Sequence, residues 1–554
     1  MKFYYKNYLH FYSVLKSLLI SLGLKKESTI SWNKILKGKR KLISKLHLDN
    51  YKDQKILIAT STGGLNFTTQ IECLVSLALY IKGYEVEFIL CDGKMNSCLM
   101  AQHNTISENE IINSGMKKIC GACFSYGNIV ISELGFKINY YSEFLSEKDL
   151  QKIKNITQYL SFDEMKNFKF EGIFLGEHAF ANLLRYYSVG RIKINEKNTK
   201  IFRNFIFSSI VTKVIFDKLF NKKKFNKIFL HHAIYVPQGI VAEVALQNKI
   251  DYITWAQTYK KNSIEISKNK HCAINNITAD NSAWINSSLK QEEEIKLIEH
   301  FEAKKNYRSE DWLTYSQSQN DEALLQFIKK NNLDDKSKNI CLFTNIIWDA
   351  QVIFPNEIFK DMLDWVSSTV DYFHKRQYLN LIIRVHPGEV KANYQSVEKI
   401  NDFLKEKYKR LNKNIFIADN DSGINSYNLA DHCSLNLVYS SRIAYELSAL
   451  GHNVIVSGSA FCKNKGVTLD PKSKDEYFNL LDRLPNDLPL ISEERKINAL
   501  KYAHYYLNKV CVEIPSLETS QDQWPPFRFS NSLIENLTME KDNGINHIVD
   551  IITK

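Results

Sequence analysis

The sequence has no apolar run of about eighteen residues, so it predicts no helix that crosses a bilayer. Its N-terminal segment also lacks the small-residue cleavage site that follows a secretory signal peptide. We therefore expect a cytosolic protein. In that compartment its ten cysteines are expected to be reduced thiols rather than a disulfide framework.

Signatures of nucleic-acid recognition are missing as well, because no RRM, zinc-finger or helix-turn-helix pattern is present. The formal net charge is nevertheless +12, from 73 basic and 61 acidic residues. A positive net charge of this size favours the binding of polyanions in general. We expect no nucleic-acid partner, which leaves anionic lipid headgroups, sugar nucleotides and acidic glycans.

A chain of 554 residues, 44% of them hydrophobic, is too long for a single core. Apolar runs that end in small polar residues alternate with helical stretches, which predicts an α/β protein with two Rossmann-like domains and parallel sheets. The expected divisions are a basic amphipathic helical segment at 1–50, an N-terminal Rossmann-like domain at 51–285, a helical connection at 286–335, a second Rossmann-like domain at 336–500, and C-terminal helices at 501–554.

Polar residues follow the predicted strands of the first domain. The first strand runs into a turn at Gly63 and Gly64, the next ends at Asp92, and a later one ends at His231 and His232. Open parallel sheets bind ligands at the carboxyl ends of their strands. A Gly-x-Gly-x-x-Gly motif is absent, so no dinucleotide site is assigned.

Four cysteines of the first domain lie close together in the sequence: Cys91, Cys98, Cys120 and Cys123. Two interpretations stay open. They complete a tetrahedral structural zinc site, for which His103 is an alternative ligand, or they are reduced, partly buried thiols.

The second domain contains two strand ends that suit a phosphate. An apolar, β-branched run stops at His386 and Pro387, which places the imidazole at the carboxyl end of a buried strand. A second strand leads into Ser440 and Ser441, predicted to cap a helix whose free N–H groups and dipole favour an anion. Glu446, further along this helix, is positioned to accept hydrogen bonds from ribose hydroxyls.

The motifs that carry a family resemblance are Arg384-x-His386-Pro387, Ser426–Asp431, Tyr439-Ser440-Ser441, Glu446 and the strand after Gly451. Together they resemble the capsule polysaccharide biosynthesis family. Its members are GT-B-type glycosyltransferases, and those best studied transfer Kdo from its CMP-activated form and are related to bacterial polysialyltransferases. The resemblance covers residues 340–515 and is looser over 55–260. Arg442 departs from it, since a small or hydroxylated residue is expected there.

The resemblance implies a metal-independent glycosyltransferase of capsule or surface polysaccharide synthesis, with both sheets facing an interdomain cleft and the C-terminal helices at 501–554 crossing back onto the first domain. A nucleotide sugar is the expected donor, with a CMP-linked acidic sugar favoured, and a glycan or lipid-linked molecule is the expected acceptor. No metal motif of the Asp-x-Asp kind lies where the donor phosphate is expected to sit, so no cofactor is expected for catalysis.

Roles follow for individual residues. The departing phosphate is expected to be stabilised by His386, Ser440 and Ser441, and by Arg384 or Arg442. Other expected substrate contacts are Pro387, Thr344, Asn345, Glu446, Gly63 and Gly64. The candidates for the catalytic base are Asp92, Glu177, His178, His231 and His232.

Other functions remain open at this stage. A teichoic-acid-type transferase also pairs His-Pro with a Ser-Ser helix start and uses CDP-linked polyol phosphates, and a non-hydrolysing sugar-nucleotide epimerase is a second alternative. A catalytically silent nucleotide- or glycan-binding component of a capsule assembly complex is a third.

Residues 1–50 alternate apolar residues with lysines and turn basic at Lys37–Lys41. Two interpretations stay open here. The segment lies on an anionic membrane surface, which would make the protein peripheral to the inner face of the cytoplasmic membrane, or it packs on the body of the enzyme.

Overall fold

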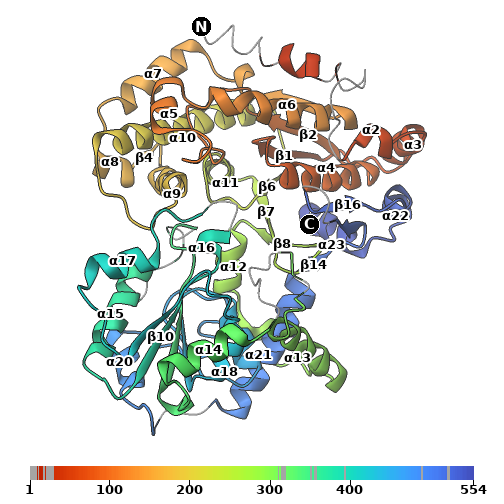
Figure 1. Cartoon of the computed structure of the whole chain (residues 1–554). Helices are drawn as coiled ribbons and strands as arrows, with labels where there is room; N and C mark the ends of the chain where they lie inside the picture. Colours follow the sequence, from red (N-terminus) through yellow and green to blue (C-terminus); the bar gives the residue numbers. More distant parts are fainter. Residues whose placement is uncertain are drawn as a thin grey trace. The chain divides into compact units, whose positions relative to one another are not determined.

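The computed structural model describes residues 9, 11–16, 19, 30–309, 311–312, 320–349, 352, 354, 358–391, 395–487, 491–520 and 525–554. The chain divides into two compact units. Unit 1 comprises Met1–Tyr187, Ile192–Cys272 and Val512–Lys554, and unit 2 comprises Ser188–Arg191 and Ala273–Cys511 (Figure 1). The units therefore change at Cys272 and Cys511, whereas the sequence analysis placed its divisions at residues 285 and 500.

Unit 1 is built on a seven-stranded sheet in the order β14-β8-β7-β6-β1-β2-β3. Its strands are β1 (Lys55–Ser61), β2 (Glu85–Leu90), β3 (Lys137–Tyr140), β6 (Lys227–His231), β7 (Asp251–Gln257), β8 (Ser263–Lys268) and β14 (Val512–Glu513). The five strands from β7 to β3 are parallel, and β8 and β14 pair antiparallel with their neighbours. All of β1 after its first residue is buried, as expected for a parallel strand covered on both faces.

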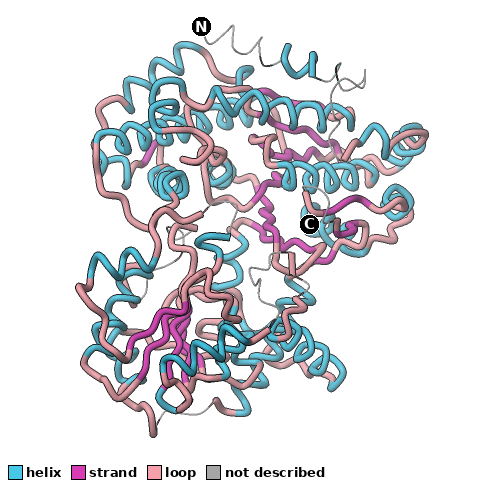
Figure 2. Tube along the Cα trace, viewed as in Figure 1, coloured by secondary structure: helices cyan, strands magenta, loops and turns pink. Residues whose placement is uncertain are grey.

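Helices flank this sheet (cyan in Figure 2). They are α2 (Trp32–Ile35), α3 (Arg40–Asp49), α4 (Asn66–Ile81), α5 (Glu108–Ser114), α6 (Lys117–Leu134), α7 (Glu147–Thr157), α8 (Phe162–Lys166), α9 (Gly176–Tyr187), α10 (Glu196–Lys222), α11 (Gln238–Gln247), α22 (Leu533–Thr538) and α23 (Asn543–Thr553). Two short antiparallel pairs join β4 (Lys169–Phe170) to β5 (Ile173–Phe174) and β15 (Leu517–Thr519) to β16 (Phe527–Phe529).

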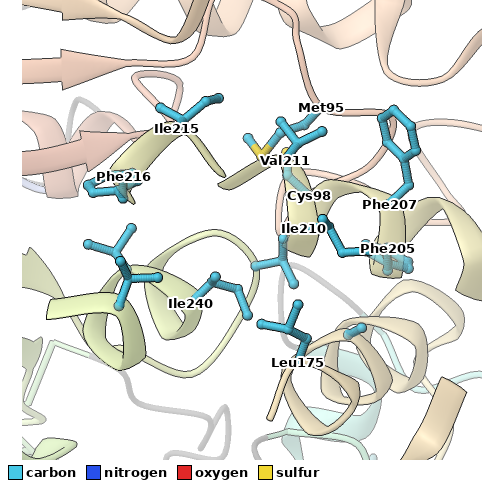
Figure 3. Close-up of a cluster of buried hydrophobic side chains, with 14 of the residues drawn as sticks. Met95, Cys98, Leu175, Phe205, Phe207, Ile210, Val211, Ile215, Phe216 and Ile240 are labelled. Carbon is cyan, nitrogen blue, oxygen red and sulfur yellow. The ribbon is translucent and has the colours of Figure 1, made fainter. Parts of the chain in front are cut away.

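The core of unit 1 gathers around α10, which supplies Phe205, Ile210 and Phe216 (Figure 3). Met95, from the segment after β2, and Ile240, from α11, pack in the same cluster. Each large apolar side chain buried in this way contributes about 1.5–3 kcal/mol. The helix is therefore fixed to the segments that follow the parallel strands.

Unit 2 contains a five-stranded, fully parallel sheet in the order β11-β10-β9-β12-β13. Its strands are β9 (Asn339–Phe343), β10 (Asn380–Arg384), β11 (Ile415–Ala418), β12 (Leu435–Val438) and β13 (Val454–Val456). Phe343 at the end of β9 is in register with both Arg384 and Val438. The residues that follow these three strands therefore emerge at the same edge of the sheet.

The helices of unit 2 are α13 (Gln291–Lys305), α14 (Glu322–Asn331), α15 (Met362–His374), α16 (Gly388–Lys391), α17 (Ile400–Lys407), α18 (Ser426–Asp431), α19 (Ile443–Ala449), α20 (Lys474–Leu481) and α21 (Glu493–Tyr505), while α12 (Cys272–Thr278) begins at the last residue of a unit 1 segment. The predicted fold class, α/β with two mainly parallel Rossmann-like sheets, is confirmed. Within the described ranges, no helix has the length and apolar character needed to span a bilayer.

Candidate functional site

Three neighbouring strand ends of unit 2 bring predicted site residues together. Thr344 and Asn345 follow β9, His386 lies two residues beyond β10, and Ser440 lies two residues beyond β12. Because β9 lies between β10 and β12, its two polar residues separate the imidazole from the serine.

Hydrogen bonds join these strand ends. The backbone N–H of His386 donates to Thr344 Oγ1 at 3.0 Å, and the backbone N–H of Ser440 donates to Asn345 Oδ1 at 3.3 Å. Thr344 N also donates to the carbonyl of Arg384 at 3.1 Å. Thr344 and Asn345 therefore fix the loops on either side of them, which holds His386 and Ser440 at one edge of the sheet.

The turn after β10 sets the state of the imidazole. The backbone N–H of Gly388 donates to His386 Nδ1 at 3.0 Å, so the neutral ring carries its proton on Nε2. A Cβ on Gly388 would lie 2.8 Å from that Nδ1, which explains the glycine after Pro387. Burial, reinforced by the charges of Arg384 and Arg442, lowers the pKa of His386 to about 4. Near neutral pH the side chain is thus a neutral N–H donor.

The serine pair after β12 is held by backbone donors. Ser440 Oγ accepts from Ser459 N at 3.1 Å, and Ser441 Oγ accepts from Ile443 N at 3.4 Å. Both serines are half-buried. The predicted Ser-Ser cap needs correction, because the N-cap of α19 is Arg442 and makes no side-chain capping bond.

Behind the serine pair lies a buried ionic cluster, which we define as Lys304, Asp311, Arg442 and Glu446. Lys304 Nζ lies 2.6 Å from Glu446 Oε1 and 3.3 Å from Asp311 Oδ2. Arg442 Nη2 lies 2.6 Å from Asp311 Oδ2. The two cations and two carboxylates compensate one another in an interior where an uncompensated charge would cost several kcal/mol.

Glu446 therefore has a different role from the ribose contact that we predicted. Its side chain is fully buried, and its two oxygens contact Lys304 Nζ and the hydroxyl of Tyr427. Burial opposes its ionisation, but the charges of Lys304 and Arg442 outweigh this and lower the pKa of Glu446 to about 2. The carboxylate is charged and engaged within unit 2.

Arg384 also needs correction as a phosphate contact. Its side chain is buried, and the guanidinium donates to the carbonyls of Asp419 at 2.6 Å and Ile424 at 2.7 Å. These contacts fix the loop after β11. Burial lowers the pKa of Arg384 to about 10, so the group stays charged at pH 7 and acts on His386 through its field.

Three residues near this edge were not among the predicted site residues. Lys304 and Asp311 lie in or next to a charged stretch that reads as solvated surface, so the sequence gives no signal for them. Glu389 follows the His-Pro-Gly turn directly and is fully buried. Its carboxylate accepts from Ile400 N at 3.3 Å and Asn420 Nδ2 at 3.2 Å, and burial raises its pKa to about 7.

In unit 1, β6 ends at His231, and the two residues that follow it have an unusual backbone. His232 has φ +31° and Ala233 has φ +58°, values that cost energy in non-glycine residues. The rings of His231 and His232 are 4.1 Å apart. Burial, with the nearby charges of His271 and Arg185, lowers the pKa of His231 to about 3. Burial, reinforced by the charge of His231, lowers the pKa of His232 well below its usual value.

The other candidate bases lie in different surroundings. Asp92 is buried and accepts from Ser142 N at 3.0 Å, so it caps the turn after β3 and is poorly placed as a base. Glu177 is exposed in the first turn of α9. The next residue, His178, contacts the Ile234 carbonyl through Nδ1 at 2.6 Å, which brings it beside the segment that follows His232.

Gly63 and Gly64, predicted as substrate contacts, are explained by packing. A Cβ on Gly63 would lie 2.6 Å from Gly127 Cα, and one on Gly64 would lie 2.9 Å from Cys123 Cα. Both partners belong to α6. The absence of side chains lets the turn after β1 approach this helix, which accounts for both glycines without a substrate contact.

The predicted zinc site is not formed. Cys91, Cys98, Cys120 and Cys123 are free thiols. In the part of the chain that the structure describes, no group of three or more His, Cys, Asp or Glu side chains is arranged to hold a metal ion. Cys123 Sγ instead accepts from Gly64 N at 3.1 Å, and burial raises its pKa to about 11.

No family model and no curated protein matches the sequence. Solved structures are similar at low identity. They include KpsC, a beta Kdo 2,7 transferase of Thermosulfurimonas dismutans (12% identity, 59% of this chain and 90% of that one, TM-score 0.32), a UDP-GlcNAc 2-epimerase of Neisseria meningitidis (11%, 81% and 97%, 0.20) and a sucrose-phosphate synthase of Thermosynechococcus elongatus (8%, 82% and 96%, 0.28). At these scores the likenesses decide nothing about activity.

Proposed function

We propose that this protein is a glycosyltransferase that takes a sugar from a nucleotide-linked donor, with the donor phosphate bound at the strand edge of unit 2. The observation that carries the proposal is the hydrogen-bonded arrangement of Thr344 and Asn345 between His386 and Ser440. A neutral imidazole N–H and serine hydroxyls at such an edge suit a phosphate that gains charge as its bond to the sugar breaks.

In the transfer, the bond between the anomeric carbon and the donor phosphate breaks, and its electron pair stays on the phosphate. The acceptor hydroxyl forms the new bond and loses its proton to a base. We propose that His386 Nε2–H and the hydroxyls of Ser440 and Ser441 donate to the phosphate oxygens. His232 is unsuited as this base, because its Nδ1 accepts from Ile234 N at 3.2 Å and the neutral ring therefore carries its proton on Nε2.

Charge at this edge favours a donor with a single phosphate, as in a CMP-linked acidic sugar of the Kdo or sialic-acid type. The carboxylates of Asp311 and Glu446 compensate Arg442 and Lys304, and His386 is neutral. The edge therefore offers hydrogen-bond donors without a large net positive charge. A diphosphate carries more negative charge and needs more compensation.

The test measures nucleotide release from CMP-, CDP- and UDP-linked sugars, and from a CDP-linked polyol phosphate, in the presence of glycan and lipid-linked acceptors. We expect release from a CMP-linked donor. His386→Ala is expected to lower kcat by about 100- to 1,000-fold, the usual effect of losing one donor to a developing negative charge. His386→Gln, which keeps an N–H group, should lose less.

A matched control is His432→Ala, since His432 follows α18 at a half-buried position outside this edge. Its activity and thermal unfolding should match those of the unmodified protein. Near-normal turnover by His386→Ala, or no thermal shift with any of the activated nucleotides, would refute the proposal. Release from a CDP-linked polyol phosphate alone would replace it with the teichoic-acid-type alternative.

A further inference from the structure

Residues 11–16 form a helical stretch with one buried side and one exposed, apolar side. On one side, Ser13 is buried and its Oγ accepts from Asn128 Nδ2 of α6 at 3.0 Å. On the other side, the exposed fractions are 66% for Phe11, 67% for Val14 and 40% for Leu15. Packing on unit 1 thus accounts for only one face of the stretch.

A second exposed surface lies at the carboxyl end of α6. Arg40 Nη2 donates to the carbonyl of Glu133 at 2.6 Å, and Trp32 N donates to the Glu133 carboxylate at 2.7 Å, so α2 and α3 are held at the carboxyl end of that helix. Leu42 and Leu48 of α3 are 46% and 73% exposed.

This second surface is strongly basic. The stretch from residue 34 to 45 contains Lys34, Lys37, Lys39, Arg40, Lys41 and Lys45 and no acidic residue. Lys41, Lys45 and Leu48 follow one another at helical spacing, so cationic and apolar side chains share one face of α3. The side chains of Lys37, Lys41 and Lys45 are all exposed.

We propose that these two surfaces dock unit 1 on an anionic lipid bilayer. Phe11, Val14 and Leu15 enter the boundary between headgroups and acyl chains, while the lysines of α3 contact the anionic headgroups. Each signal alone gives weak, reversible binding, and the combination gives stable association. A purely apolar protein partner would not use six cations, and an acidic soluble partner would not use the exposed Phe11 and Leu48.

The inference does not rest on the proposed transferase activity, because it concerns a surface anchored on α6 and no residue of the strand edge in unit 2. It does bear on the acceptor. A protein docked in this way meets a lipid-linked substrate by diffusion in two dimensions.

The experiment is co-sedimentation of the full chain with vesicles of phosphatidylcholine, with and without 30 mol% phosphatidylglycerol, a probe composition with about one anionic headgroup in three. We expect binding to the anionic vesicles that weakens as salt is added, and little binding to the neutral ones. The variant Lys37→Gln/Lys41→Gln/Lys45→Gln should lower the partition coefficient on the order of 100-fold, from about fivefold per cation. Phe11→Ser/Val14→Ser/Leu15→Ser should also lose binding.

A matched control removes three other exposed lysines of unit 1, in the variant Lys148→Gln/Lys152→Gln/Lys154→Gln on α7. This variant changes the net charge by the same amount but leaves both proposed surfaces intact, so it should bind like the unmodified chain. Equal loss in this control would mean that overall charge, and not this surface, drives binding, and would overturn the proposal. Absence of binding by the unmodified chain, or equal binding to neutral vesicles, would overturn it as well. Thermal unfolding of each variant checks that the fold is retained.

Discussion

Lys304 offers the sharpest test of how unit 2 is held together beneath the serine pair. Its side chain is 4% exposed and lies 2.6 Å from the fully buried Glu446 carboxylate. Lys304→Met keeps the length and apolar stem of the side chain but removes the charge. Glu446 then keeps only Arg442, whose Nε is 3.8 Å away, and Tyr427 as partners.

We expect this substitution to cost about 3–5 kcal/mol of unfolding free energy, the usual range when one member of a buried ion pair is removed. The comparison variant is Lys296→Met on the same helix, α13. Lys296 pairs with Glu292 at 2.8 Å, but both side chains are more than two-thirds exposed. Its loss should cost at most about 1 kcal/mol.

The assay is urea unfolding followed by circular dichroism, together with hydrogen exchange of the α19 amides, which reports the region next to Ser441. A second variant, Lys304→Met/Glu446→Leu, removes both charges and should recover part of the lost stability. If Lys304→Met is no more destabilising than Lys296→Met, then the cluster is solvated in solution and the reasoning about Glu446 and Arg442 fails.

Two further predictions concern other positions. Because burial raises the pKa of Glu389 to about 7, the folded state holds this proton more tightly than the unfolded chain, and its contribution to stability is present below about pH 4.5 and is lost as the pH rises to about 7. The unmodified protein should therefore lose ~3 kcal/mol of unfolding free energy across that window, and Glu389→Gln should remove this loss. The measurement compares the unfolding free energies of the variant and the unmodified protein at each pH. Identical pH profiles would contradict the prediction. Gly63→Ala would place a Cβ 2.6 Å from Gly127 Cα and should cost about 1–3 kcal/mol, whereas Gly121→Ala, whose nearest neighbour would be 3.9 Å away, should be neutral or stabilising by thermal unfolding. Equal effects at the two glycines would show that the turn after β1 adapts freely.

The strand ends of unit 2 were predictable because their signal is local. An apolar run stopped by polar residues or by His386 and Pro387 fixes where a buried strand ends, and parallel pairing then places Thr344, His386 and Ser440 at one edge.

Side-chain direction was not predictable in the same way. Arg384 is the last residue of β10, and its guanidinium points into the loop after β11. Glu446 and Lys304 are far apart in the sequence, so their pairing depends on how α13 packs beside α19. Gly63 carries no pattern that separates a ligand contact from close packing of a turn on a helix.

Unit 1 is assembled from the beginning, the middle and the end of the chain, while nearly all of unit 2 is one uninterrupted stretch, Ala273–Cys511. Val512–Lys554 is synthesised after all of unit 2, so β14 pairs with β8 only once the sequence of unit 2 has been translated. Helix α23, which buries Ile545, Ile548 and Ile552, is likewise added to unit 1 after unit 2. A stop codon shortly before α23 would leave unit 2 whole and would deprive unit 1 of this helix.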